Sequence, residues 1–79
     1  MDNNLFANLD KLHTTAMGID RIKRNLKIDE TDVVKYCYDI ILNPKTFIQR
    51  KGKNWYVYFE NIKITVNANS YTIITAHKI

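Results

Sequence analysis

The sequence is poor in three residue types on which many scaffolds and sites depend. Its 79 residues include one cysteine, one proline and two glycines. A lone cysteine, Cys37, excludes an internal disulfide and a zinc site made of several cysteines. Two glycines are too few for the loops that cradle nucleotide phosphates, and neither a P-loop nor a GxGxxG motif is present.

Long apolar runs are also missing. No stretch stays apolar over the roughly 20 residues that span a bilayer, and residues 1–4 lack the basic and then apolar layout of a secretory signal. The composition, 46% hydrophobic and 25% charged, is typical of a globular protein and too apolar for a disordered one. We therefore expect one domain over residues 1–79, located in the cytoplasm and without a membrane partner.

Acidic side chains are nearly absent from the second half of the chain. Residues 45–79 carry six basic side chains and one acidic one, Glu60, whereas residues 1–44 carry six basic and seven acidic ones. A basic half on a small domain indicates an anionic partner, either RNA or an acidic protein surface. The alternative is that these cations only keep the protein in solution and protect the edges of a sheet.

The first half of the chain has the periodicity of helices. Apolar residues recur every three to four positions, which predicts two or three helices over about residues 4–43. One stripe runs from Leu5 to Leu12, and a second helix follows with Thr14 or Thr15 as its cap. We expect Asp29 to cap the third helix, which Pro44 ends.

The second half changes to a period of two. Four β-rich runs, at about residues 46–50, 54–59, 62–67 and 71–78, are separated by short turns and predict an antiparallel meander. The expected fold is α+β, with the N-terminal helices packed on one face of a three- to four-stranded antiparallel sheet over about residues 45–78.

Alternation along these runs predicts which side chains share a face. Trp55 shares a face with Val57, and this favours a position in the core for Trp55. The alternative interpretation is that its ring is a platform on which a base stacks. In the last run, strict alternation places Ile73, Thr75 and His77 together.

A basic turn followed by aromatic residues is the first candidate site. Cations at this turn could hold phosphates while a ring stacks on an unpaired base. Tyr56 and Lys63 fall on strands whose exposed face would extend the same surface. On the last strand, His77 is a neighbour of Thr75, and the two could donate to one phosphate. The candidate nucleic-acid-binding residues are therefore Arg50, Lys51, Lys53, Tyr56, Lys63 and His77. The competing interpretation is a solvated turn beside a half-exposed sheet.

The second candidate site is catalytic and consists of His13, Arg21 and Arg24. A histidine can move protons near neutral pH, and arginines can stabilise the charge that develops on phosphorus during RNA cleavage. Such a reaction needs no metal and no cofactor, and no metal-binding spacing is present. The competing interpretation is a surface histidine beside an ordinary charged helix.

Three segments carry a resemblance to known families: LHTT at 12–15, RKGKNWY at 50–56 and SYTIITAHK at 70–78. Together they resemble a family of short bacterial proteins of unknown function over essentially the whole chain. More weakly, the order of histidine, arginines, basic hairpin and threonine-bearing strand is similar to the barnase–EndoU–colicin–RelE group of toxin ribonucleases. That resemblance implies catalytic roles for His13, Arg21 or Arg24, and Thr75.

Two functions remain open at the level of sequence. The first is a small RNA-binding protein, and the toxin resemblance implies a metal-independent endoribonuclease of the kind found in toxin–antitoxin systems. The second is a non-catalytic module that binds a protein, such as a phage or mobile-element inhibitor of a host or defence enzyme. A homodimer formed through an edge strand, with the final strand as one candidate, is compatible with both.

Overall fold

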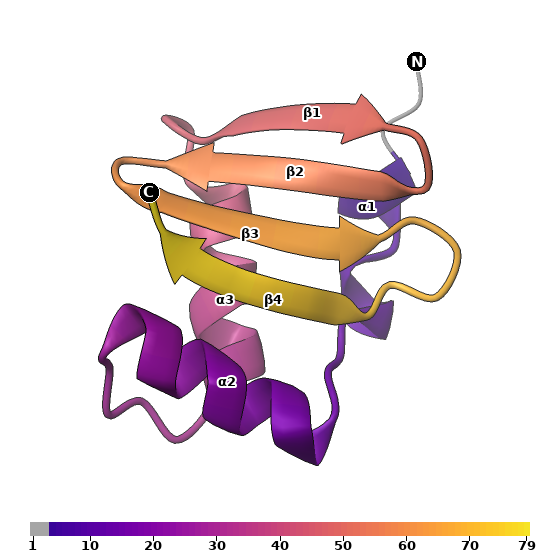
Figure 1. The fold of residues 1–79 in the computed structure, drawn as a ribbon. Helices are drawn as coiled ribbons and strands as arrows, with labels where there is room; N and C mark the ends of the chain where they lie inside the picture. The colour runs from indigo at the N-terminus through magenta and orange to yellow at the C-terminus, as the bar shows by residue number, and fades with distance from the viewer. Residues whose placement is uncertain (1–3) are drawn as a thin grey trace.

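The change of periodicity near residue 45 divides the molecule into a helical layer and a sheet (Figure 1). The structure is a computed structural model that describes residues 4–79, so residues 1–3, which belong to the segment assessed above for a secretory signal, lie outside the description. The helical elements are α1 (Asn4–Ala7), the 3-10 helix η1 (Leu9–Lys11), α2 (Ala16–Leu26) and α3 (Val33–Leu42). The strands are β1 (Phe47–Lys51), β2 (Asn54–Phe59), β3 (Ile62–Asn67) and β4 (Ile73–Lys78). The predicted α+β class is confirmed.

The four strands form one antiparallel sheet in the order β1-β2-β3-β4, as the meander prediction requires. Tight reversals join them, and the φ angles there are positive at Gly52 (62°), Glu60 (53°) and Tyr71 (59°). Only Gly52 adopts this left-handed conformation without a steric cost from a Cβ atom.

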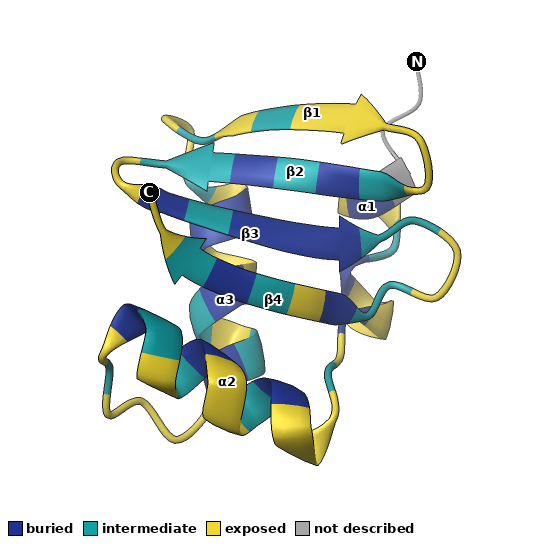
Figure 2. Ribbon diagram, viewed as in Figure 1, coloured by how far each residue is buried: buried dark blue, intermediate teal, exposed yellow. Residues whose placement is uncertain are grey.

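The core lies between the sheet and the helices (Figure 2). Trp55 is 2% exposed, which confirms its predicted place in the core. Burial of one such large apolar side chain contributes about 1.5–3 kcal/mol relative to leaving it exposed. The buried apolar residues are Leu5, Leu9, Leu12, Ile22, Leu26, Val33, Cys37, Ile40, Ile41, Trp55, Val57, Ile62, Ile64, Val66, Ile73 and Ala76.

Both longer helices begin with a side-chain cap, but only the predicted cap of α2 is confirmed. The side chain of Thr15 accepts a hydrogen bond from the backbone N–H of Gly18 (3.0 Å) and caps α2, as predicted. The cap of α3 is Asp32, which accepts from Lys35 N (3.0 Å), so the prediction of Asp29 was wrong. A capping carboxylate must stand immediately before the first helical residue, and only Asp32 holds that place.

The predicted stripe from Leu5 to Leu12 does not form one continuous helix. It is divided between α1 and η1, and Phe6, which the stripe would bury, is 47% exposed. Helices this short have few internal hydrogen bonds, so packing of Leu5, Leu9 and Leu12 against the core holds the segment in place.

The predicted face of Ile73 in the last strand was wrong, because this strand contains a β-bulge. The pairing of β3 with β4 shifts between Thr65 and Val66, so that Ile73 lies opposite Val66 and becomes buried. Ile74 is the extra residue, and after it Thr75 lies opposite Thr65. Ile73 therefore does not share a face with Thr75, because one inserted residue inverts the alternation.

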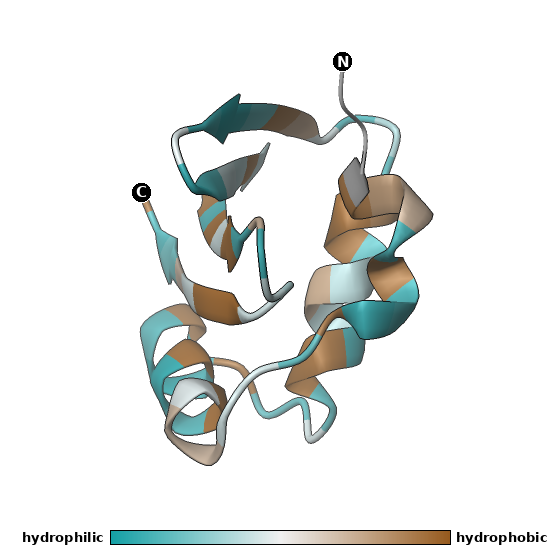
Figure 3. Cartoon of the chain, turned by 90° about the vertical axis from the view of Figure 1, so that its right-hand side faces the viewer, coloured by the Kyte–Doolittle hydropathy of each residue, from teal (hydrophilic) through white to brown (hydrophobic). Residues whose placement is uncertain are grey.

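Helix α2 lies beside β4 at one edge of the sheet, whereas α1 and α3 cover one of its faces (Figures 1 and 3). The segment that leads into α2 is hydrogen-bonded to the start of β4: His13 N donates to Tyr71 O (3.2 Å), and Ile73 N donates to His13 O (2.7 Å). Thr14 Oγ1 donates to Ile73 O (2.9 Å). A Cβ atom at Gly18 would overlap Thr14 Oγ1, which explains the glycine. Of the helices in residues 4–79, none is both long and apolar enough to cross a membrane.

Burial of the Cys37 thiol in α3 predicts a pH dependence of stability. Desolvation raises its pKa from the ordinary 9.0 to about 12. Above pH 9 the unfolded thiol ionises while the folded thiol stays neutral, so the free energy of unfolding decreases as the pH rises from about 9 to 12. Between pH 8 and 10 this group is expected to remove about 1 kcal/mol.

Urea unfolding of the native chain and of Cys37→Ala, at pH 8 and pH 10, isolates this contribution. The stability difference between the two proteins should shrink by that amount at the higher pH, since the tyrosines and lysines titrate in both. A difference that is independent of pH would contradict the assigned burial.

Candidate nucleic-acid interface

The face of the sheet that points away from α1 and α3 carries no helix in the part of the chain that the structure describes (Figure 3). None of the four strands contains an acidic residue. Cross-strand partners project to the same face, so the pairings define this outer face. Its residues are Phe47, Gln49, Lys51, Asn54, Tyr56, Tyr58, Lys63, Thr65, Asn67, Thr75 and His77.

Lys63 and two tyrosines form the centre of the outer face. Lys63 lies directly opposite Tyr58, and its Nζ lies 4.9 Å from the centroid of the Tyr56 ring and 5.7 Å from that of Tyr58. The ring of Phe47 lies 6.1 Å from that of Tyr58. An ammonium group over aromatic rings is attracted by their negative faces, which holds Lys63 across both tyrosines.

Beside this cation lies a shallow hollow of about 290 Å³. We call it the tyrosine–lysine hollow; it is lined by Gln49, Lys51, Tyr56, Tyr58 and Lys63. It combines two ammonium groups with two rings and one amide. Ammonium groups attract a phosphate, and rings can stack on a base, so the hollow has the parts that one nucleotide of a single strand requires.

Four of the six predicted nucleic-acid-binding residues lie together on the outer face: Lys51, Tyr56, Lys63 and His77. His77 pairs directly with Lys63 across the β3–β4 ladder. Alternation predicted that Tyr56 and Lys63 share this face, whereas the pairing of the strands adds Lys51 and His77 to it.

Arg50 and Lys53 lie elsewhere. Arg50 pairs with Trp55 and projects to the covered side, where its guanidinium lies 5.4 Å from the Trp55 ring. Its Nε donates to Gly52 O (3.0 Å). Lys53 is in the β1–β2 turn, and its carbonyl accepts from Ala68 N (2.7 Å), which fastens that turn to the β3–β4 turn.

His13 is held by hydrogen bonds on both ring nitrogens. Its Nδ1 lies 2.8 Å from the carbonyl oxygen of Lys11, which can only accept, so Nδ1 carries a proton. In the neutral ring Nε2 then accepts from Thr72 Oγ1 (3.1 Å), and Thr72 in turn meets Ser70 Oγ at 2.7 Å. We call this the His13–Thr72–Ser70 chain. It links the segment before α2 to the turn before β4.

The structure does not join His13 to the other candidate catalytic residues. Arg21 and Arg24 are exposed on α2, and Thr75 faces outward from the middle of β4. Among the hydrogen bonds of residues 4–79, none links these three side chains to His13. Its actual partner, Thr72, is 59 residues away along the chain, and no local pattern marks that contact.

No group of three or more histidine, cysteine or acidic side chains that could hold a metal ion occurs among residues 4–79. The hydroxyl-rich turn around Ser70 is occupied by its own hydrogen bonds. Asn67 Oδ1 accepts from Asn69 N (2.8 Å) and Ser70 N (2.9 Å), so these backbone donors are turned inward.

The His13–Thr72 hydrogen bond predicts a coupled contribution to stability. His13→Ala and Thr72→Val should each lower the free energy of unfolding by about 1 kcal/mol, because each removes one partner of the same bond. The double variant should lose less than the sum of the two, by about 0.5 kcal/mol or more. Urea unfolding of the four proteins measures this; strictly additive losses would show that the contact contributes nothing.

A family model described as "Protein of unknown function (DUF3781)" matches residues 6–77 of the chain. This confirms the resemblance to a family without a known function. No curated protein and no solved structure matches the chain.

Proposed function

We propose that this chain, which belongs to the family of proteins of unknown function DUF3781, binds single-stranded RNA on the outer face of its sheet. The observation that carries the proposal is the position of Lys63 across Tyr56 and Tyr58, beside a hollow on a face without carboxylates. The identity of the family leaves the function to be argued from this geometry.

Electrostatics supports a polyanion as the ligand. The tyrosine–lysine hollow holds Lys51 and Lys63, and His77 lies opposite Lys63. Because the four strands contain no acidic side chain, none of their side chains repels phosphates that approach this face. Lysine ammonium groups neutralise backbone phosphates without regard to sequence, and each neutralised phosphate releases counterions.

The magnitudes favour an exchange of partners for Lys63 when RNA binds. Its contact with two partly exposed rings contributes about 0.5–1 kcal/mol. A base that stacks on one of these rings contributes about 1–3 kcal/mol, and the released ammonium can move to a phosphate. Stacking of a base therefore contributes more free energy than the loss of the contact between Lys63 and the rings costs. This argument requires unpaired bases, which is why the proposed ligand is single-stranded.

Binding is better supported than cleavage. A general base must reach the 2′-hydroxyl of RNA, but both ring nitrogens of His13 have hydrogen-bond partners within the protein. Among residues 4–79, no hydrogen bond joins Arg21, Arg24 or Thr75 to His13. We therefore expect RNA to remain intact on the protein, and the ribonuclease role is the less favoured form of the proposal.

The test is the affinity for a fluorescent single-stranded RNA 12-mer as a function of salt. The logarithm of the affinity should fall linearly with the logarithm of the salt concentration. Lys63→Gln should reduce the slope by about 0.7, the value for one phosphate of a single strand. Lys78→Gln is the matched control, because Lys78 pairs with Ile62 and projects to the other side of the sheet.

Aromatic stacking is tested separately with Tyr58→Leu and Tyr58→Phe. The leucine variant should bind RNA about 10-fold more weakly or worse, whereas phenylalanine keeps the ring and most of the affinity. Equal effects of Lys63→Gln and Lys78→Gln, or RNA binding that Tyr58→Leu leaves unchanged, would contradict the outer face as the site. Displacement of the RNA by polyglutamate at similar charge concentration would instead favour the alternative partner, an acidic protein surface.

A further inference from the structure

The two edges of the sheet differ in how they are covered. Strand β4 lies beside α2, whereas no strand of residues 4–79 pairs with the side of β1 that faces away from β2, which we call the open edge (Figure 1). The two-residue turn at 52–53 makes Lys51 and Asn54 the first hydrogen-bonded pair of the β1–β2 hairpin. Such pairs alternate along an antiparallel ladder with pairs that are not hydrogen-bonded. Ile48 belongs to the second kind, so its backbone N–H and C=O point to the open edge.

The usual devices that protect an edge strand are weak in β1. Natural proteins use proline, a bulge or charged side chains for this purpose. The sequence of β1, FIQRK, contains no proline, and its register with β2 is continuous. The guanidinium of Arg50 lies over the Trp55 ring of β2, at 5.4 Å, and is therefore directed away from the open edge. The middle of the strand thus presents no charge that would repel an added strand.

An apolar side chain at the start of β1 is left in solvent. Phe47 is 62% exposed, and its ring meets that of Tyr58 on the β2 side, at 6.1 Å. A strand added at the open edge would cover the other side of the ring. Removal of apolar area from water favours such an addition.

Strand β1 is complementary to a second copy of itself in one antiparallel register. Outward-pointing backbone groups must meet, so the possible registers differ by two residues. When Gln49 faces Gln49 of the second copy, all five residues of β1 are paired, and Lys51 lies opposite Phe47. A slip of two residues would set Arg50 opposite Arg50 in one direction and Lys51 opposite Lys45 in the other. Like charges directly opposite each other are unfavourable, whereas an ammonium is attracted by the face of a ring.

We propose that two copies of this chain associate through β1, antiparallel and centred on Gln49, so that their two four-stranded sheets become one. A two-fold axis through the pair makes the interface self-complementary. Both outer faces then lie on the same side, and the tyrosine–lysine hollow of one copy, which Gln49 lines, adjoins that of the other. The association does not depend on RNA binding, and RNA binding by a monomer would leave the proposed function intact.

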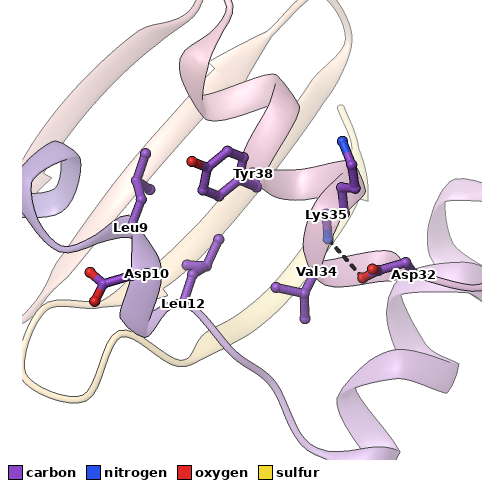
Figure 4. A pocket seen from close by; sticks show the side chains of 7 residues that line it. All are labelled: Leu9, Asp10, Leu12, Asp32, Val34, Lys35 and Tyr38. Atoms are coloured by element: carbon purple, nitrogen blue, oxygen red, sulfur yellow. Dashed lines mark hydrogen bonds between the residues drawn. The ribbon is translucent and has the colours of Figure 1, made fainter.

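A competing surface for self-association is a hollow of about 400 Å³ in the helical layer, between η1 and α3 (Figure 4). Its apolar lining consists of Leu9, Leu12, Val34 and Tyr38. This hollow lacks the outward backbone groups that select a second copy at β1. Tyr38, which is 36% exposed, supplies a control substitution away from β1.

Cysteine cross-linking tests the register. The two Gln49 residues would form a pair that is not hydrogen-bonded, with Cα atoms about 4.5 Å apart. A disulfide bridges that distance, but not the roughly 13 Å between the two Lys51 residues. In a glutathione buffer, Gln49→Cys should therefore form an intermolecular disulfide about 10-fold faster than Lys51→Cys, a control at an exposed position of the same strand. The native Cys37 is buried in both variants. Equal rates, or no disulfide in either variant, would contradict the register.

Sedimentation equilibrium tests the association itself. Ile48→Pro removes an N–H that points to the open edge and spares the pairing with β2, so it should weaken the dimer about 10-fold. Phe47→Lys places like charges opposite each other and should weaken it by about the same factor, and the added substitution Lys51→Glu should restore it. Tyr38→Lys should have no effect, and urea unfolding checks that each variant is folded. A native chain that stays monomeric at high concentration, or a dimer that Tyr38→Lys weakens and Phe47→Lys does not, would overturn the proposal.

Discussion

The one-sided burial of the β-sheet is the constraint on which the rest of the molecule depends. Val57, Ile64 and Val66 are completely buried against the helices, and this packing supplies much of the stability of so short a chain. Residues 4–43 provide only enough helix to cover that one face and the β4 edge. No helix of residues 4–79 covers the other face, so most of its side chains can take a function other than packing.

A second constraint is the attachment of the segment before α2 to the start of β4. Backbone hydrogen bonds from His13 and Ile73 form it, and the imidazole of His13 closes it through Thr72. Hydroxyl groups can both donate and accept, so Thr72 can bond to the ring of His13 and to Ser70 at the same time. With these partners, His13 stabilises the attachment of the segment before α2 to β4. The outer face is therefore the better candidate for a functional site.

Charge is distributed unevenly over the molecule. The strands carry no acidic side chain, and Lys51 and Lys63 line the tyrosine–lysine hollow. On the helical side, by contrast, Asp39 pairs with Lys35 on α3. The net charge of +4 therefore does not describe the outer face.

Features that repeat along the chain could be predicted from the order of its residues. The period of two predicted that Lys63 would face outward and that Trp55 would be buried, and Pro44 marked the end of α3. Tertiary structure alone decided that Asp32 and not Asp29 caps α3, that a bulge at Ile74 turns Ile73 inward, and that His13 meets Thr72. Periodicity is local, because it depends only on residues that are close together along the chain. Bulges and hydrogen bonds between distant residues depend instead on which surfaces pack together when the chain folds.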